Sequence, residues 1–187
     1  AIEINAGGAR CTIEDCELDC GNTESPRAIL QNAVDANMRT IVRRCNILKM
    51  DNGVHAAGGL DIRDCYFHDF VRGDVPEPAP HPDGIQFEQG ATNIVIVHNR
   101  IVGDAITSCV NIYNESGTQC AGVWVVNNKF SGGSYCIYGP RFAGATNIFI
   151  NHNRLRGWTF NHDDVDTALI NEAVGNVNDD TGAALTF

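Results

Sequence analysis

The sequence predicts an all-β protein, a parallel β-helix of about six to seven turns in which each turn of chain stacks on the one before. The first observation is a short motif of constant length: an aliphatic residue, two polar residues, Cys or Asn, one outward residue, then a large apolar residue. It recurs at 13–18, 42–47, 62–67, 96–101, 125–130 and 150–155. The second is that successive Cys or Asn positions lie 20 to 34 residues apart, so only the connecting loops change length.

Alternating apolar and polar residues within the motif indicate strands rather than helices. Residues 92–97 show the period of two plainly, and the chain has 19 Gly, which suits tight turns better than helices. A β-sandwich of short strands is the alternative fold, but it does not require one residue type at the same phase six times. Residues 25–34 allow two interpretations. They form either a short helix, capped by Ser25 with Pro26 at its first position, or another strand.

The Cys or Asn position predicts an internal ladder. An Asn turned inward at a bend must satisfy its amide, and stacked amides hydrogen-bond to one another and to neighbouring turns. Asn also tolerates the left-handed backbone that such a bend needs. The expected ladder comprises Asn99, Asn128 and Asn153, continued toward the N-terminus by an apolar stack of Cys16, Cys45 and Cys65.

Length and charge exclude several classes of partner. The 187 residues suit one domain, 1–187, with a C-terminal tail at 173–187 outside the repeat. A formal net charge of −10 gives no general attraction for nucleic acid or an anionic membrane. No stretch is apolar enough to span a bilayer. Residues 1–3 match the phase of 53–55, so we expect the chain to begin inside a turn of the coil, either as a fragment of a longer protein or capped by a partner.

The eight cysteines lack the C-x-x-C spacing of a zinc or redox site. Those at repeat positions are expected to be buried as small apolar groups. The remaining candidates for disulfide bridges are Cys20, Cys109, Cys120 and Cys136, and the sequence leaves their connectivity open.

A second column, of a polar residue, a small residue and an aliphatic residue, precedes each first strand. Its members are 52–54, 83–85, 104–106 and 135–137, with Asp166 as a weaker one. This phase predicts that Asp83 and Asp104 stack one turn, about 4.8 Å, apart. Two carboxyls so close shift each other's pKa apart, as acid and base catalysis requires, so Asp83 and Asp104 are the candidate catalytic residues. The alternative is a local turn in which Asp83 accepts from nearby backbone N–H groups.

The motifs in this column resemble those of the right-handed parallel β-helix superfamily that includes pectate lyases, polygalacturonase-like glycoside hydrolases and phage tailspikes. In those hydrolases Asn-Thr-Asp-Gly is followed by Asp-Asp, Gly-His-Gly and Arg-Ile-Lys. Here 81–84 is similar to the first motif, and 103–104 keeps one Asp of the second. The turn at 132–136 has no counterpart of the later motifs. The resemblance implies a single-stranded right-handed coil and a polysaccharide ligand.

The same face carries the expected substrate-binding residues. They are His55, His81, Gln86, Glu88, Thr107, Tyr138 and Arg141. If the chain is a hydrolase, Asp83 and Asp104 serve as general acid and base. A lyase needs instead a cationic base beside a cation that neutralises the uronate, and Arg141 is the candidate.

A third column follows the ladder position. Its residues are Glu17, Asn46, Tyr66, Arg100, Lys129 and Arg154, so three cations are expected to stack. Like charges directly opposite are unfavourable unless they are solvated or paired, so this column marks either a solvated surface or a contact with an acidic polymer or partner. No cofactor or metal site is indicated with certainty. The acidic runs 161–166 and 176–180 are candidate Ca²⁺ ligands without the spacing of an EF-hand.

Two functions stay open. The first is a polysaccharide-binding β-helix that also cleaves its ligand as a glycoside hydrolase or lyase. The alternative is a non-catalytic structural or adhesive module of a phage tailspike or another surface assembly, with copies of itself or virion chains as partners. Both place the protein outside the cell or on a virion surface.

Overall fold

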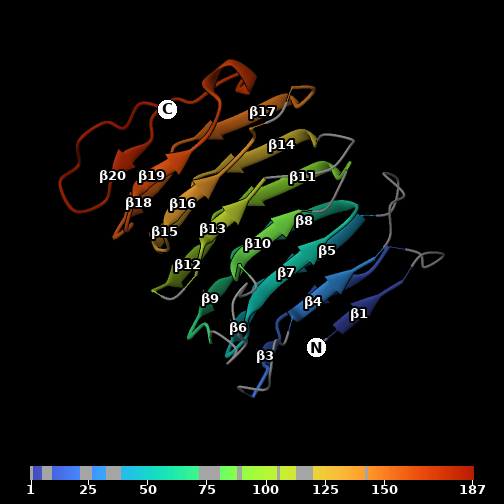
Figure 1. Ribbon diagram of the computed structural model, residues 1–187. Helices are drawn as coiled ribbons and strands as arrows, with labels where there is room; N and C mark the ends of the chain where they lie inside the picture. The colour runs from blue at the N-terminus through green and yellow to red at the C-terminus, as the bar shows by residue number, and fades with distance from the viewer. Residues whose placement is uncertain are drawn as a thin grey trace.

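The computed structural model is a right-handed parallel β-solenoid, so the predicted fold is confirmed (Figure 1). It describes residues 2–5, 10–21, 27–32, 39–71, 81–87, 90–104, 106–112, 120–141 and 143–187. The coil makes about five turns, slightly fewer than predicted, with short strands at its ends. Every strand pair within the three sheets is parallel, so the β-sandwich alternative is wrong.

Each complete turn contributes one strand to each of three sheets. Sheet A has the order β1 (Ile2–Ile4), β4 (Arg27–Gln31), β7 (Asn52–Ala56), β10 (Asp83–Phe87), β13 (Ser108–Asn111), β16 (Tyr135–Tyr138) and β19 (Asn161–Asp164). Sheet B contains β2 (Thr12–Glu14), β5 (Arg39–Arg43), β8 (Gly59–Arg63), β11 (Thr92–Val97), β14 (Ala121–Val126) and β17 (Thr146–Asn151). Sheet C contains β3 (Glu17–Asp19), β6 (Asn46–Leu48), β9 (Tyr66–His68), β12 (Arg100–Gly103), β15 (Lys129–Gly132), β18 (Arg154–Arg156) and β20 (Val177–Asn178).

The remaining element is a short 3₁₀ helix, η1 (Thr167–Leu169). Of the two interpretations of residues 25–34, the strand is correct, because 27–31 form β4. The phase expected for the N-terminus is also confirmed, since Ile2 pairs with Ile29 and Ile29 with Val54. Within the described residues, no helix is long and apolar enough to cross a membrane.

The repeated motif forms the last strand residues of sheet B, the bend, and the first residues of sheet C. Its aliphatic member and its large apolar member both point into the coil, so they form two walls of one core. Fully buried examples are Ile62, Ile96, Phe67 and Phe130. The residue before the ladder position adopts a left-handed conformation in every copy, as His98 (φ 60°) does. This conformation turns the chain sharply from sheet B to sheet C.

The Asn ladder is present and is longer than predicted. The amide Nδ2 of Asn99 donates to Oδ1 of Asn128 at 3.1 Å, and Asn128 donates in the same way to Asn153 at 3.0 Å. Asn153 donates to Asn176, a further member at 3.0 Å. Each Oδ1 also accepts a backbone N–H from the neighbouring rung, as Asn128 does from Asn99 at 2.9 Å. The buried amides are therefore satisfied by one another and by the backbone.

Asn176 is not predicted by the motif because its flanking residues depart from it. Ala173 stands at the aliphatic position and Asn178 at the large apolar position. The backbone nevertheless continues the stack, since β20 pairs with β18 and places Val177 beside Arg154. The end of the ladder is thus provided by the segment that was expected to be a tail outside the repeat.

The cysteines continue the column without bridging. Cys45 and Cys65 are buried and their thiols donate to the carbonyl oxygens of Arg43 and Arg63, each at 3.2 Å. Cys16, at the first rung, is exposed. All eight cysteines are free, so the disulfides expected among Cys20, Cys109, Cys120 and Cys136 are not formed. Burial raises the pKa of the Cys120 thiol to about 11, which keeps it protonated and unreactive.

We predict that Asn128→Ala lowers the free energy of unfolding by about 3 kcal/mol, because the backbone N–H and side-chain amide of Asn99 both lose their buried acceptor. Urea unfolding followed by circular dichroism measures the change. The control is Asn127→Gly, an exposed neighbour at a left-handed position that Gly also adopts, with an expected change below about 0.5 kcal/mol. Equal losses in the two variants would contradict the ladder's role.

Candidate functional site

The register of sheet A places Ser108, not Asp104, beside Asp83. Asp83 pairs with Ser108 on the next rung, and Ser108 pairs with Tyr135 on the one after. Asp104 lies in the turn after β12 and is exposed. The predicted stacking of Asp83 on Asp104 is therefore wrong.

The physical reason is that the chain needs residues to turn the corner from sheet C into sheet A. β12 extends to Gly103, which pairs with Gly132, so Asp104, Ile106 and Thr107 lie at the corner before β13. The triplet 108–110 repeats the pattern of a polar, a small and an aliphatic residue four positions later, and it carries the true phase. Asp166, the weak member predicted for the last turn, instead caps η1 by accepting from the backbone N–H of Ala168.

The small residue of each triplet faces the interior of the coil. A Cβ added at Gly84 would lie 3.0 Å from Ile101 Cγ2, and one at Gly53 would lie 2.7 Å from Phe67 Cδ1. Cys109 and Cys136 occupy the same place on the following rungs and are fully buried. A Cβ at either glycine would also lie 2.4 Å from a carbonyl oxygen of the next rung, so the backbone of sheet A and the side chains of sheet C together explain why Gly stands at this position on these two rungs.

Asp83 is the centre of a buried polar network on sheet A. Its side chain has no exposed surface, and its carboxylate accepts from the hydroxyl of Ser108 and, at 2.7 Å, from the amide of Asn111. Its backbone N–H donates to Oδ1 of Asn52 at 2.8 Å, so the network joins three rungs. The alternative of a local turn is also wrong, because Asp83 starts β10 and its partners lie on other rungs.

Burial raises the pKa of Asp83 from its ordinary value of 3.8 to about 7. The hydrogen bonds from Ser108 and Asn111 act in the opposite direction, while the nearby carboxylate of Asp51 adds to the increase. Asp51, which is itself 2 % exposed, is therefore the carboxyl that influences Asp83. The sequence pattern predicts Asp104 instead as the carboxyl that shifts the pKa of Asp83.

We predict that the free energy of unfolding of the unmodified chain, relative to that of Asp83→Asn, falls as the pH rises from about 4 to about 7. Between these pH values the folded state holds a proton on Asp83 that the unfolded state has released. The stability that Asp83 contributes is therefore fully present below its pKa in the unfolded chain, and it is lost as the pH rises through its pKa in the folded chain. The loss is on the order of 4 kcal/mol. Urea titrations at several pH values measure it, and a difference that grows with pH would show that Asp83 is ionised in the fold.

The predicted binding residues fall into three groups. Pairing between rungs aligns His55, Gln86 and Tyr138 in one row, with Asn111 between Gln86 and Tyr138. His81 and Thr107 lie just before β10 and β13, with the Thr107 hydroxyl 3.5 Å from His81 Nδ1. Glu88 lies outside the described residues. His55 is buried, Gln86 and Tyr138 are half-buried, and His81 is exposed.

Arg141, the remaining predicted residue, joins Tyr138 in a cluster at the C-terminal end of the row. Its guanidinium donates to the hydroxyl of Tyr138 at 2.9 Å and pairs with Asp164 at 3.3 Å. The Tyr138 ring lies 5.4 Å from that of Tyr135, and Tyr135 lies 5.8 Å from Phe160, measured between ring centroids. Phe160 is 72 % exposed. Aromatic surface and a charged hydrogen-bonding pair therefore meet on one face.

Tyr135, Phe160 and Asn111 were not among the predicted binding residues. Tyr135 stood in a recognised triplet, and the register of 108–110 would have placed Asn111 in the row. Phe160 lies in the loop before β19, where the sequence gives no periodic signal.

The acidic runs considered for Ca²⁺ take other parts. In the first, 161–164 form β19, and Asp163 contacts the ring of His162. In the second, Asn176 ends the ladder and Asp179 pairs with basic side chains. Among the described residues, no group of three or more His, Cys, Asp or Glu side chains is arranged to hold a metal ion.

Comparison of the chain with family models, curated proteins and solved structures finds no match in any of the three. The geometry of sheet A therefore carries the functional conclusion.

Proposed function

We propose that this chain binds a polysaccharide across the outer face of sheet A, outside the cell or on a virion surface. The observation that carries the proposal is the row His55, Gln86, Asn111 and Tyr138, which pairing between rungs holds in register. Successive rungs are about 4.8 Å apart, so Gln86 and Tyr138, the half-buried members of the row, offer polar groups in a fixed register to a ligand that is itself a repeat, while His55 and Asn111 are buried.

The aromatic cluster at the end of the row supports a sugar ligand in particular. A pyranose ring has one apolar face, which packs on aromatic rings, and a rim of hydroxyls, which need donors and acceptors. Tyr135 and Phe160 supply the rings, and the Arg141–Asp164 pair supplies both kinds of polar group. The likeness of residues 81–84 to the hydrolases of the right-handed parallel β-helix superfamily agrees with this ligand class.

The proposal is limited to binding. Hydrolysis by two carboxyls needs both of them at one glycosidic bond. The register puts Ser108 opposite Asp83, while Asp83 has no exposed surface and Asp104 lies at a corner. The buried Asp83 network instead fixes the strand ends beneath the polar row, because it links three consecutive rungs.

We predict that the double variant Tyr135→Ala, Tyr138→Ala binds polysaccharide at least tenfold more weakly than the unmodified chain. Affinity electrophoresis on a panel of neutral and acidic polymers identifies the ligand, and calorimetry measures the dissociation constant. The matched control is Trp124→Ala, which removes an aromatic ring from sheet B, where Trp124 stacks on Phe149 at 5.7 Å. The control is expected to bind normally.

Two results bear on the alternatives. Failure of the unmodified chain to bind any polymer would favour the structural or adhesive module. Release of reducing ends or unsaturated products by the unmodified chain would extend the function to cleavage, and loss of that release in Asp83→Asn but not in Asp104→Asn would identify the acid.

A further inference from the structure

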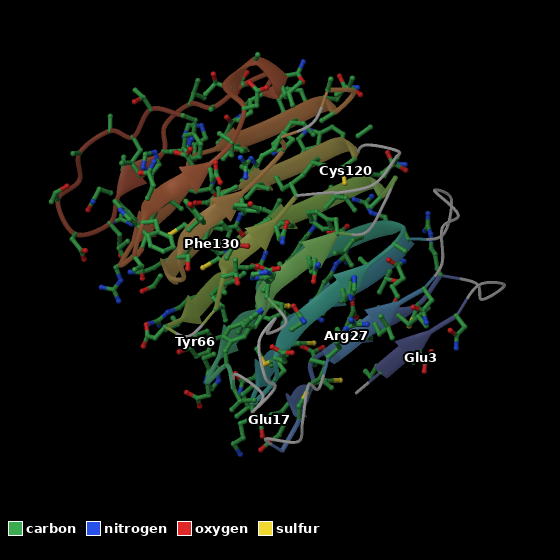
Figure 2. All side chains as sticks on the ribbon, in the orientation of Figure 1. Glu3, Glu17, Arg27, Tyr66, Cys120 and Phe130 are labelled. Atoms are coloured by element: carbon green, nitrogen blue, oxygen red, sulfur yellow. The ribbon has the colours of Figure 1, made fainter. Side chains whose placement is uncertain are left out.

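A groove lies on the bend between sheets B and C, away from sheet A. It encloses about 430 Å³ and crosses four rungs, with the bend residues on one side and the outward column of sheet C on the other. Its lining comprises Asp64, Cys65, Tyr66, His98, Asn99, Arg100, Asn127, Asn128, Lys129 and Arg154. Tyr66 stands at the edge of the solenoid along which β9, β12 and β15 follow one another (Figures 1 and 2).

Three cations stand in line along this groove. Arg100 pairs in register with Lys129, and Lys129 with Arg154, so they occupy successive rungs about 4.8 Å apart. Like charges in directly opposed positions repel, and the ladder gives them no freedom to separate along the axis. In a chain of net charge −10, such a row is a local exception that attracts anions.

The chain itself shows which anion two of these cations accept. Asp179, with a side chain only 5 % exposed, contacts Lys129 Nζ at 2.7 Å and the Nε of Arg154. These contacts, that of Lys129 first, hold the pKa of Asp179 below its usual range, so the carboxylate stays charged. A carboxylate therefore fits between successive rungs of this column.

Arg100 differs from Lys129 and Arg154 in its contacts. Its guanidinium lies 5.0 Å above the centre of the Tyr66 ring, and within the described residues it makes no ion pair with a carboxylate. It is exposed and lines the groove next to Lys129. Among the residues that the structure describes, the row thus presents one cation without a carboxylate partner beside two that are partly neutralised, over a groove that crosses four rungs.

We infer that this groove binds the carboxylates of an acidic polysaccharide, with Arg100 as the main anchor and Lys129 and Arg154 as further contacts. The regular spacing suits an extended polymer that carries one carboxylate per unit. Asp179 limits the affinity, because it competes for two of the three cations. Asp64, which lines the same groove, disfavours a polyanion as densely charged as nucleic acid.

The probe is polygalacturonate, and dextran is the neutral comparison. All variants carry the Tyr135→Ala, Tyr138→Ala background, so failure of the sheet A proposal and failure of this one are separated. We expect the background chain to bind polygalacturonate but not dextran, with an affinity that falls as salt is raised. Calorimetry measures the dissociation constant.

Two opposite changes test the residues. Arg100→Ala is expected to weaken binding about tenfold, and Asp179→Asn to strengthen it about fivefold by releasing Lys129 and Arg154. The matched controls change the same charge elsewhere on the coil. Arg44→Ala removes a bend cation that pairs with Asp15, and Asp19→Asn removes a carboxylate that pairs with Lys49. Neither control is expected to alter binding more than twofold.

The inference is overturned if polygalacturonate does not bind, if Arg100→Ala binds as tightly as Arg44→Ala, or if a single-stranded oligonucleotide binds more tightly than polygalacturonate. Circular dichroism would reveal whether Asp179→Asn loosens the C-terminal segment. If it does, Arg100→Ala still tests the inference, because Arg100 is exposed and its replacement is not expected to disturb the fold.

Discussion

The stacking of one rung on the next, held in register by the buried ladder, is the constraint on which every other feature depends. Backbone hydrogen bonds alone allow parallel strands to slip, but a buried amide without its partner costs about as much as a lost core contact. Asn99, Asn128, Asn153 and Asn176 accept and donate only when each lies directly over the next. Once that alignment is set, each outward position of every rung belongs to a straight row, and the loops change length without disturbing it.

This constraint explains which features the sequence could predict. Around the ladder, a buried residue with a strict hydrogen-bonding requirement shows which position of the turn each residue occupies. Both the ladder and the cationic row beside it were therefore predicted correctly. On sheet A the marker is only a small residue before an aliphatic one, a pattern satisfied both at 104–106 and at 108–110. Which of the two starts the strand depends on how many residues turn the corner after Gly103, and that is a property of three-dimensional packing. The error at Asp104 follows from this ambiguity, and the contact of Asp179 with Lys129 was hidden because the two lie on segments far apart in sequence.

Sheet A and the cationic row beside the bend accommodate their charged side chains in different ways. On sheet A the carboxyl of Asp83 is fully buried, and burial favours its neutral form by raising the pKa, while the hydrogen bonds from Ser108 and Asn111 satisfy its oxygens. On the bend, the charges of Lys129 and Arg154 remain near the surface and are balanced by Asp179. The first arrangement gives a neutral face in which hydroxyls find donors and acceptors. The second leaves a charged face in which Asp179 partly neutralises two of the cations.

A solenoid of this kind can therefore vary its outward side chains without altering its fold, because the residues that set the register are not the residues that we propose to meet a ligand. His55, Gln86 and Tyr138 are outward neighbours of buried positions, and so are Arg100 and Lys129. Replacing any of them leaves the ladder intact, whereas the spacing between them stays that of the rungs. Specificity along each face is then a linear pattern of side chains read at a fixed interval of about 4.8 Å. Such a pattern suits an extended polymer whose repeat distance matches the spacing of the rungs. A compact ligand has no repeat and gains nothing from the spacing.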